Sequence, residues 1–134
     1  MLENMRQSYM KEIRNKRILV VDDEQNIRHV FSRMISFIGF EVDVAESGDK
    51  ALNHLLKSQF DLVLTDLNMP GMDGLTLAHH IKEISPQTPV ILVTGEKKEK
   101  ILKKMEDSSV DSVLFKPVQL HDIRETVQRI LARH

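Results

Sequence analysis

Five side chains that can bind metal ions or phosphate stand where apolar, strand-like runs of the sequence end. Asp22 and Asp23 follow the first run, Asp66 and Thr94 close the third and fourth, and Lys116 closes the fifth. Each has an ordinary structural explanation by itself: a helix cap, a turn former, a strand-end hydroxyl or a solvated amine. Acids that face an amine and a hydroxyl at one edge of a sheet are harder to explain by folding alone. We therefore treat the five together as a candidate site.

The three carboxylates predict a bound cation, because acids this close repel one another unless a positive charge neutralises them. All the candidate ligands are oxygens, the chain has no Cys, and no His stands beside the acids. This donor set favours Mg²⁺ or Mn²⁺ over Zn²⁺. Asp66 is then the best candidate for a nucleophile on phosphorus, since carboxylates form aspartyl-phosphates. Lys116 would neutralise phosphoryl oxygens and Thr94 would donate a hydrogen bond to one of them.

Short β-rich runs alternate with helical patterns along the chain, and the five predicted strands span residues 18–21, 41–44, 62–65, 90–93 and 112–115. Three of these runs are almost wholly apolar, as central parallel strands are, whereas residues 41–44 alternate like an edge strand. Right-handed crossovers then give an α/β fold of the (βα)5 type with a doubly wound, five-stranded parallel sheet. Ligands of such sheets bind beyond the carboxyl ends of the strands, where the candidate site lies.

Apolar residues at helical spacing predict helices over residues 27–38, 51–56, 78–84, 98–105 and 120–131. Gly39 ends the first, Ser47 starts the second and Pro86 ends the third. The fourth has only Ile101, Leu102 and Met105 as its apolar stripe, and its lysines read as a solvated face. We divide the chain into an N-terminal extension, residues 1–16, and one domain, residues 17–134.

The extension shows no clear pattern, so we expect a frayed segment and no dedicated element. Met5, Tyr9 and Ile13 are nevertheless spaced so that they could share one helix face.

Composition favours protein partners over nucleic acid, because a formal charge of -1 supplies no basic field. The length of 134 residues fits a single domain. The absence of Cys excludes disulfides and is compatible with a reducing compartment, so we expect a cytoplasmic protein. No apolar run approaches the roughly 20 residues of a membrane span, and no signal segment precedes the first strand, so we expect neither secretion nor membrane insertion.

Four motifs resemble those of one family, the receiver (phosphoacceptor) domain of two-component response regulators, chemotaxis regulators included. They are Val20-Val21-Asp22-Asp23-Glu24, the loop from Asp66 to Gly74 (DLNMPGMDG), Val93-Thr94-Gly95-Glu96 and Phe115-Lys116-Pro117. The resemblance covers residues 17 to about 132. It implies a flavodoxin-like strand order of 2-1-3-4-5 and a signalling switch activated by phosphorylation. Such a domain is a phosphoacceptor with self-catalysed phosphotransfer and autodephosphorylation, and is not otherwise an enzyme.

The resemblance also implies a role for each residue of the site. Asp23, Asp66 and the backbone carbonyl of Asn68 would bind Mg²⁺ directly, and Asp22 would act through water. Asp66 is the implied phosphoacceptor.

Further implied roles concern the phosphoryl group and the loops around it. Thr94 and Lys116 would bind the phosphoryl group, and the bond from Lys116 to Pro117 would be cis. Asn68 and Glu96, two residues beyond the phosphoacceptor and the Thr, would set the rate of autodephosphorylation. Both are polar and short or flexible enough to orient an attacking water, so we expect comparatively fast loss of the phosphoryl group.

The sequence departs from the family pattern at the output switch. Three residues before the strand-five Lys an aromatic residue or His is usual, and here it is Val113. Val113 has no ring to swing into the space that a moving Thr94 vacates, so we expect the loop from Thr94 to Lys98 and the following helix to transmit activation. Phe115 shares a side of the strand with Val113 and is either a substitute switch residue or plain core packing.

The implied phosphoryl donor is a histidine kinase or a histidine phosphotransfer protein. A downstream protein would bind the face formed by residues 98–105, 112–115 and 120–131. We expect a monomer or a phosphorylation-dependent dimer with no direct binding of nucleic acid or membrane. The chain ends at Arg133-His134 without an output module, so we expect either a stand-alone receiver or an excised domain.

Three alternatives stay open. A haloacid-dehalogenase-like phosphatase needs an acid two residues after its Asp nucleophile, where this chain has Asn68. A flavodoxin needs hydroxyl- and amide-rich turns for the FMN phosphate, which Asp22, Asp23 and Glu24 would repel. A receiver that signals without phosphorylation would not need the complete set of acids, Thr and Lys.

Overall fold

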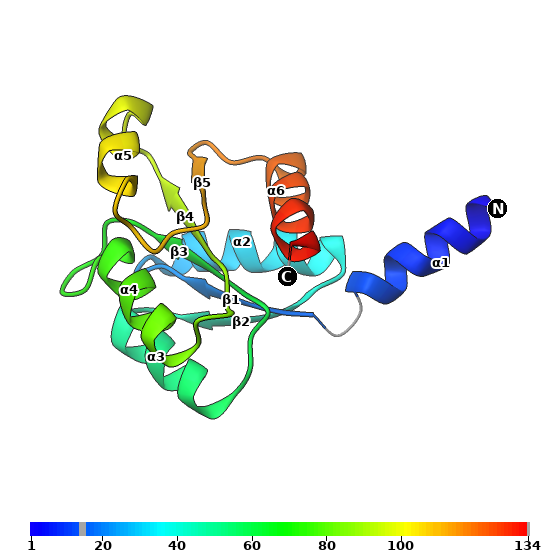
Figure 1. The fold of residues 1–134 in the computed structure, drawn as a ribbon, viewed down its shortest axis with the longest axis horizontal. Helices are drawn as coiled ribbons and strands as arrows, with labels where there is room; N and C mark the ends of the chain where they lie inside the picture. The colour runs from blue at the N-terminus through cyan, green and yellow to red at the C-terminus, as the bar shows by residue number, and fades with distance from the viewer. Residues whose placement is uncertain (14–15, 134) are drawn as a thin grey trace.

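The five predicted strands form one parallel sheet in the order β2-β1-β3-β4-β5. Figure 1 shows this computed structural model, which describes residues 1–13 and 16–133, with side chains for residues 1–7 and 16–133. The strands are β1 (Arg17–Val21), β2 (Glu41–Ala45), β3 (Leu62–Asp66), β4 (Val90–Thr94) and β5 (Ser112–Phe115). The predicted fold class and strand order are therefore confirmed.

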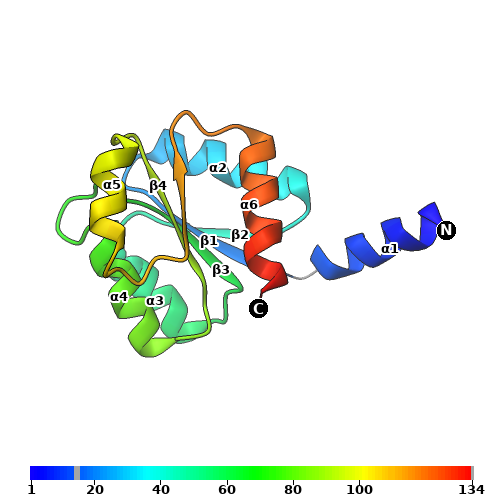
Figure 2. The same ribbon diagram turned by 45° about the horizontal axis from the view of Figure 1, so that its top comes forward.

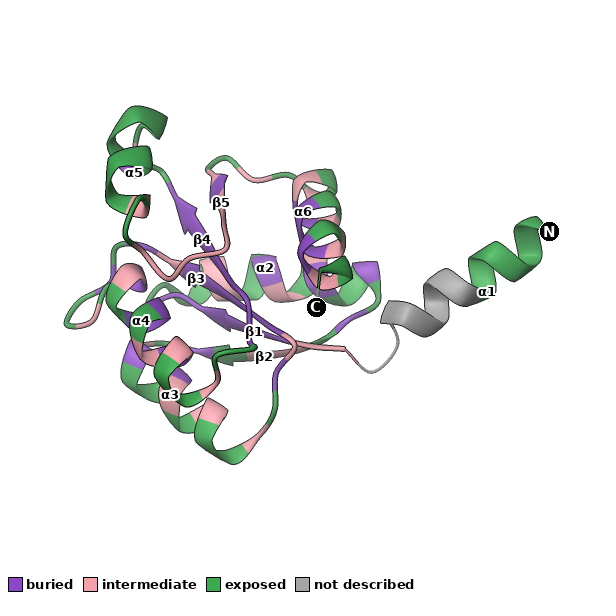
Figure 3. Ribbon diagram, viewed as in Figure 1, coloured by how far each residue is buried: buried purple, intermediate pink, exposed green. Residues whose placement is uncertain are grey.

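The sheet is most deeply buried at its centre. Almost every residue of β1, β3 and β4 is buried, because helices cover both faces of these strands. The edge strand β2 leaves Val44 exposed, as its alternating sequence predicts. Figure 3 shows the contrast between the buried central strands and the exposed outer surfaces of the helices.

Two layers of helices enclose the sheet. The helices that follow β1 to β5 are α2 (Gln25–Ile38), α3 (Gly48–Lys57), α4 (Gly74–Ile84), α5 (Lys98–Met105) and α6 (Leu120–Ala132). Helices α2 and α6 pack on one face through Ile35 and Ile123, whereas α3 and α4 pack on the other through Ala51 and Ile81. Helix α5 packs on this second face against residues of β4 and β5, and Figure 2 shows it beside β4 on the same side as α3 and α4.

The predicted helix boundaries follow from local chemistry. Gly39 ends α2 with a φ of 120°, a left-handed conformation that favours glycine. The Ser47 hydroxyl accepts a hydrogen bond from the Lys50 N–H at the start of α3, and the Asp73 carboxylate accepts one from the Thr76 N–H at the start of α4. The helix α4 begins four residues before its first predicted apolar residue.

Some apolar residues of the predicted stripes are exposed instead. They are Val30, Leu56, Ile84 and Leu102. Each lies at the edge or end of its helix's apolar stripe, and a helix on a sheet buries only the middle of that stripe. Leu102, predicted as part of the apolar stripe of α5, is therefore not buried, and Ile101 is the buried residue of that helix.

The N-terminal residues form a helix, α1 (Leu2–Ile13), so the expectation of a frayed segment is wrong. The segment contains neither Gly nor Pro and is rich in good helix formers, which outweighs its weak apolar pattern. Figure 1 shows α1 extending away from the sheet. Met5 is exposed, whereas the side chains of Tyr9 and Ile13, predicted on the same face, lie outside the described residues.

The described helices include none that is both long enough and apolar enough to cross a lipid bilayer.

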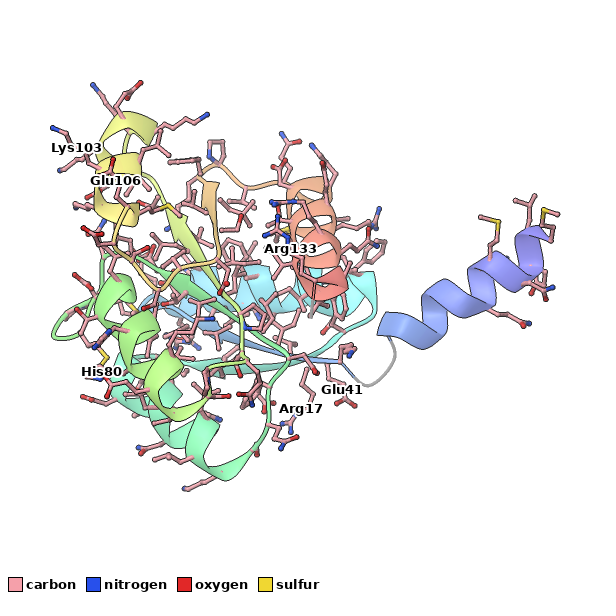
Figure 4. All side chains as sticks on the ribbon, viewed as in Figure 1. Arg17, Glu41, His80, Lys103, Glu106 and Arg133 are labelled. Carbon is pink, nitrogen blue, oxygen red and sulfur yellow. The ribbon has the colours of Figure 1, made fainter. Side chains whose placement is uncertain are left out.

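Ion pairs join neighbouring strands at the amino end of the sheet. Figure 4 shows Arg17 and Glu41 close together at the starts of β1 and β2, where their charged groups lie 3.9 Å apart. The opposite, carboxyl end carries the candidate site.

Candidate functional site

The carboxyl ends of four neighbouring strands bring the candidate residues together. Strand β3 lies between β1 and β4, and β5 pairs with β4, all in parallel. In this register Asp66 lies opposite Val93, and Thr94 lies opposite Phe115, the residue before Lys116. The predicted side chains therefore gather at one edge of the sheet.

The three acids form a tight cluster. Carboxylate oxygens of Asp22, Asp23 and Asp66 all lie within 4.8 Å of one another. Asp22 is buried, the side chain of Asp66 is only 11% exposed, and Asp23 is open to solvent. A cation could therefore approach the cluster from the side of Asp23.

Asp22 is held in place by backbone groups on both sides. Its Oδ1 accepts a hydrogen bond of 2.9 Å from the Glu24 N–H, and its own N–H donates one of 3.1 Å to the Ala45 carbonyl. The Arg28 guanidinium on α2 donates to the Asp22 carbonyl at 2.8 Å. The first turn of α2 thus fixes the acidic end of β1, a role for Arg28 that the sequence did not reveal.

Lys116 faces Asp66 directly. Its Nζ lies 3.2 Å from Oδ1 of Asp66, and the Lys116 N–H donates to the Thr94 carbonyl at 2.8 Å. The bond from Lys116 to Pro117 is cis, as the resemblance implied. A single ammonium group therefore stands beside a cluster of three carboxylates.

The electrostatics of the cluster favour an added positive charge. Burial raises the pKa of the Asp66 carboxyl above its usual value, although the Lys116 ammonium opposes this and Asp23 adds to it. Burial likewise raises the pKa of Asp22, against the hydrogen bond from the Glu24 N–H. Without a cation, Asp22 and Asp66, the two less exposed acids of the cluster, are thus harder to ionise than ordinary aspartates.

The loop that follows Asp66 packs closely against the site. Gly71 has a φ of 79°, which permits the tight turn after Pro70. A Cβ added to Gly74 would lie 2.3 Å from the backbone oxygen of Asp66 and 2.8 Å from Cδ1 of Leu92. Gly74 is therefore required for the close approach of α4 to β3, and its place directly after the capping residue Asp73 is the sequence signal for it. Asn68 is exposed in this loop.

Thr94 is fully buried at the end of β4. Its Oγ1 accepts a hydrogen bond of 3.0 Å from the Glu96 N–H. Next to it, Val113 and Phe115 both pack against the small cluster of Leu67, Leu92 and Ile101, so they lie on the same side of β5 as the alternation predicts.

Comparison with known proteins identifies the family. The family model of the response regulator receiver domain matches residues 18–128. The chain belongs to the receiver-domain family. The four motifs named in the sequence analysis lie inside the matched range.

Its relatives include receiver domains of two kinds. The chain is 38% identical to the sensor histidine kinase RcsC of Escherichia coli over 82% of the chain, and it spans only 12% of that protein. It is 32% identical to the chemotaxis protein CheY-3 of Vibrio cholerae, over 90% of the chain and 95% of that protein. The chain therefore spans a small part of some relatives and nearly the whole of others.

Solved receiver structures share the fold. A response regulator receiver domain protein from Clostridium thermocellum superposes with a TM-score of 0.80 at 30% identity, covering 88% of this chain and 95% of that one. The response regulator TrrA from Thermotoga maritima, solved in complex with Mg(2+)-BeF, has a TM-score of 0.76 at 32% identity, covering 86% and 98% of the two chains.

The acidic cluster fits the metal site of a receiver domain. Its donors are carboxylate oxygens, which are the ligands that hard divalent cations prefer. The raised pKa values of Asp22 and Asp66 give a physical reason for a cation here, since burial disfavours the ionised acids.

Proposed function

We propose that this receiver domain is a phosphorylation-activated switch of a two-component phosphorelay, in which Asp66 accepts the phosphoryl group in a Mg²⁺-dependent reaction. The observation that carries the proposal is the cluster of Asp22, Asp23 and Asp66 with the Lys116 ammonium 3.2 Å from Asp66. Of the three acids, Asp66 is the one in contact with Lys116, and it lies on the central strand of the sheet.

The proposed reaction transfers a phosphoryl group without any redox change. A carboxylate oxygen of Asp66 attacks phosphorus, a new oxygen–phosphorus bond forms, and the bond from phosphorus to the donor nitrogen of phosphohistidine breaks. The electron pair of that bond returns to the imidazole nitrogen. Lys116 neutralises charge on the phosphoryl oxygens, and Thr94 donates a hydrogen bond to one of them.

Asp23, Asp66 and the backbone carbonyl of Asn68 would hold Mg²⁺ directly, with Asp22 acting through water. The ion, when bound, supplies positive charge that offsets both the acids and the incoming phosphoryl oxygens. Asp22 is held firmly, because its carboxylate and both of its backbone polar groups are hydrogen-bonded.

The donor in this proposal is a histidine kinase or a histidine phosphotransfer protein, in keeping with the sensor kinases among the relatives. The activated domain binds a downstream protein through the face of α5, β5 and α6, as a monomer or as a phosphorylation-dependent dimer, in the cytoplasm. Autodephosphorylation, tuned by Asn68 and Glu96, resets the switch.

Activation in this proposal is transmitted mainly by the loop from Thr94 to Lys98 and by α5. Val113 offers no ring to couple β5 to the site, and Phe115 is already packed against Leu67, Leu92 and Ile101. Helix α5 is the easier element to shift, because it is short and Ile101 is its buried residue.

The test is phosphorylation of the purified domain by acetyl phosphate, followed by intact mass measurement. Wild type should gain one phosphoryl group in Mg²⁺ and none in EDTA, and Asp66→Asn should gain none. Asp73→Asn is the matched control, because it keeps the α4 cap in the same loop and should be labelled like wild type. An adduct of equal occupancy on Asp66→Asn would refute the assignment.

A further inference from the structure

The carboxylate of Glu96 points toward α5. Its Oε2 lies 3.3 Å from Nζ of Lys104, and its Oε1 lies 3.8 Å from Nζ of Lys100. Both carboxylate oxygens are thus occupied by lysines of one helix. The Glu96 side chain is 18% exposed, whereas those of Lys104 and Lys100 are 40% and 65% exposed, so water screens these pairs in part.

The backbone of the same residue contacts Thr94. The Glu96 N–H donates to Oγ1 of Thr94 at 3.0 Å, and Thr94 has no solvent-exposed surface. A side chain without exposed surface cannot touch an incoming phosphoryl group unless it or its surroundings move. The Thr94 hydroxyl can accept this hydrogen bond and still donate one to the group, but if Thr94 moves, the bond lasts only if the loop that carries Glu96 moves with it.

Glu96 thus connects the two places that must change together. Its N–H holds the Thr94 hydroxyl, and its carboxylate holds α5 through Lys100 and Lys104. Helix α5 itself is weakly anchored: Ile101 is its buried residue, and its N-cap residue Lys97 makes no side-chain cap. Ion pairs that fix the loop against the helix consequently favour the arrangement in which Thr94 is buried and hydrogen-bonded to the Glu96 N–H.

We infer that Glu96 is a positioning residue whose ion pairs with Lys100 and Lys104 oppose the movement of Thr94 and so weaken binding of the phosphoryl group. The inference rests on the proposed function, because it takes Thr94 to bind that group. It gives Glu96 a positioning role in addition to the tuning of autodephosphorylation proposed above.

The test measures the affinity for beryllofluoride in Mg²⁺ buffer by amide NMR titration, an equilibrium readout free of hydrolysis. Glu96→Gln keeps the shape of the side chain and should bind about threefold more tightly, the scale of a moderately exposed ion pair. Lys104→Met should also tighten binding, although Lys104 lies on α5 and not in the loop that carries Glu96. The difference in affinity between wild type and Glu96→Gln should shrink as salt is added, because salt screens the ion pairs that only wild type retains.

The matched control is Lys103→Met, on the same helix. Lys103 extends into solvent, as Figure 4 shows, and makes no ion pair or hydrogen bond among the residues described, so its replacement should leave the affinity unchanged. In a variant that already carries Lys100→Met and Lys104→Met, adding Glu96→Gln should not change the affinity further. Both partners of Glu96 are then already removed, and the effects of coupled residues do not add.

The outcomes separate the two proposals. If wild type binds beryllofluoride and Glu96→Gln binds no more tightly, the role of Glu96 is wrong and the proposed function stands. If wild type itself fails to bind in Mg²⁺, the proposed function falls and takes this inference with it.

Discussion

The two sides of the site differ in how firmly the fold holds them. On one side, Asp22 and Asp66 stand at the ends of two buried central strands, and α2, which follows Asp22, buries Phe31, Ile35 and Ile38. On the other side, Thr94 leads through an exposed loop into α5, whose buried residue is Ile101. A metal and phosphate site needs fixed ligands, whereas a signal needs an element that moves at low cost. The difference indicates that this fold separates the two tasks.

We expect the largest effect from a substitution at Gly74, on the fixed side of the site. Gly74→Ala should cost about 4 kcal/mol or more and abolish phosphorylation, because the new Cβ meets the Asp66 backbone only 2.3 Å away. Gly95→Ala is the control on the other side: nothing lies within 4 Å of its Cβ, so its stability should change by less than about 0.5 kcal/mol. Urea unfolding and acetyl phosphate labelling measure both. A stable, fully labelled Gly74→Ala would show that α4 does not need this close approach.

Two buried isoleucines compare the packing of the two sides. Ile35→Ala and Ile101→Ala both remove a side chain without exposed surface, and such changes cost about 2–5 kcal/mol. We expect Ile101→Ala to cost about 1 kcal/mol less, because α5 is short and flanked by partly exposed residues, so the cavity can collapse. Chemical denaturation of the two variants checks this. Equal costs would mean that α5 is as firmly packed as α2.

A smaller effect concerns the charge of the fixed side. Burial raises the pKa of Asp66 above the ordinary value of 3.8. Below that value the carboxyl is protonated in both the folded and the unfolded chain. As the pH rises through the higher pKa of the folded chain, the stability that the protonated carboxyl contributes to the folded state is lost. In metal-free buffer at neutral pH, Asp66→Asn should therefore be more stable than wild type. The extra stability of Asp66→Asn over wild type should become smaller as the pH is lowered.

Magnesium provides the control for this prediction. It should raise the melting temperature of wild type, because a ligand of the folded state alone stabilises it, and it should raise that of Asp66→Asn much less. If wild type were as stable as Asp66→Asn at neutral pH without metal, the raised pKa of Asp66 would be contradicted.

The smallest expected effect is on the lifetime of the phosphoryl group. Asn68 is exposed in the loop after Asp66, so a longer, charged side chain there should shield phosphorus from water. Asn68→Lys should slow phosphoryl decay a few-fold with little change in stability. Decay after removal of acetyl phosphate measures it, and a rate equal to that of wild type would show that residue 68 does not control access.

Much of this structure follows from the sequence, because the relevant signals are local. Apolar runs predict the strands, and Gly39 and Ser47 predict helix ends within a residue. The clustering of Asp22, Asp23 and Asp66 follows from parallel topology, which brings strand ends to one edge. These signals need no knowledge of side-chain packing.

What the sequence did not reveal depends on contacts between distant elements or on the edge of a pattern. Arg28 reaches the carbonyl of Asp22 only once α2 has packed, and Glu96 finds Lys104 only once the loop has folded. Leu102 fits the apolar stripe of α5 by spacing and is nevertheless exposed, since the sheet buries only Ile101 beside it. Helix α1 was missed because good helix formers outweigh a weak apolar pattern.

The most direct test of the division between a fixed and a movable side is amide hydrogen exchange with and without beryllofluoride in Mg²⁺ buffer. We predict changes in protection over residues 94–105, little change in β1 and the first turn of α2, and loss of the response over residues 94–105 in Thr94→Ala. Changes confined to β5 and Phe115, with residues 94–105 silent, would contradict it.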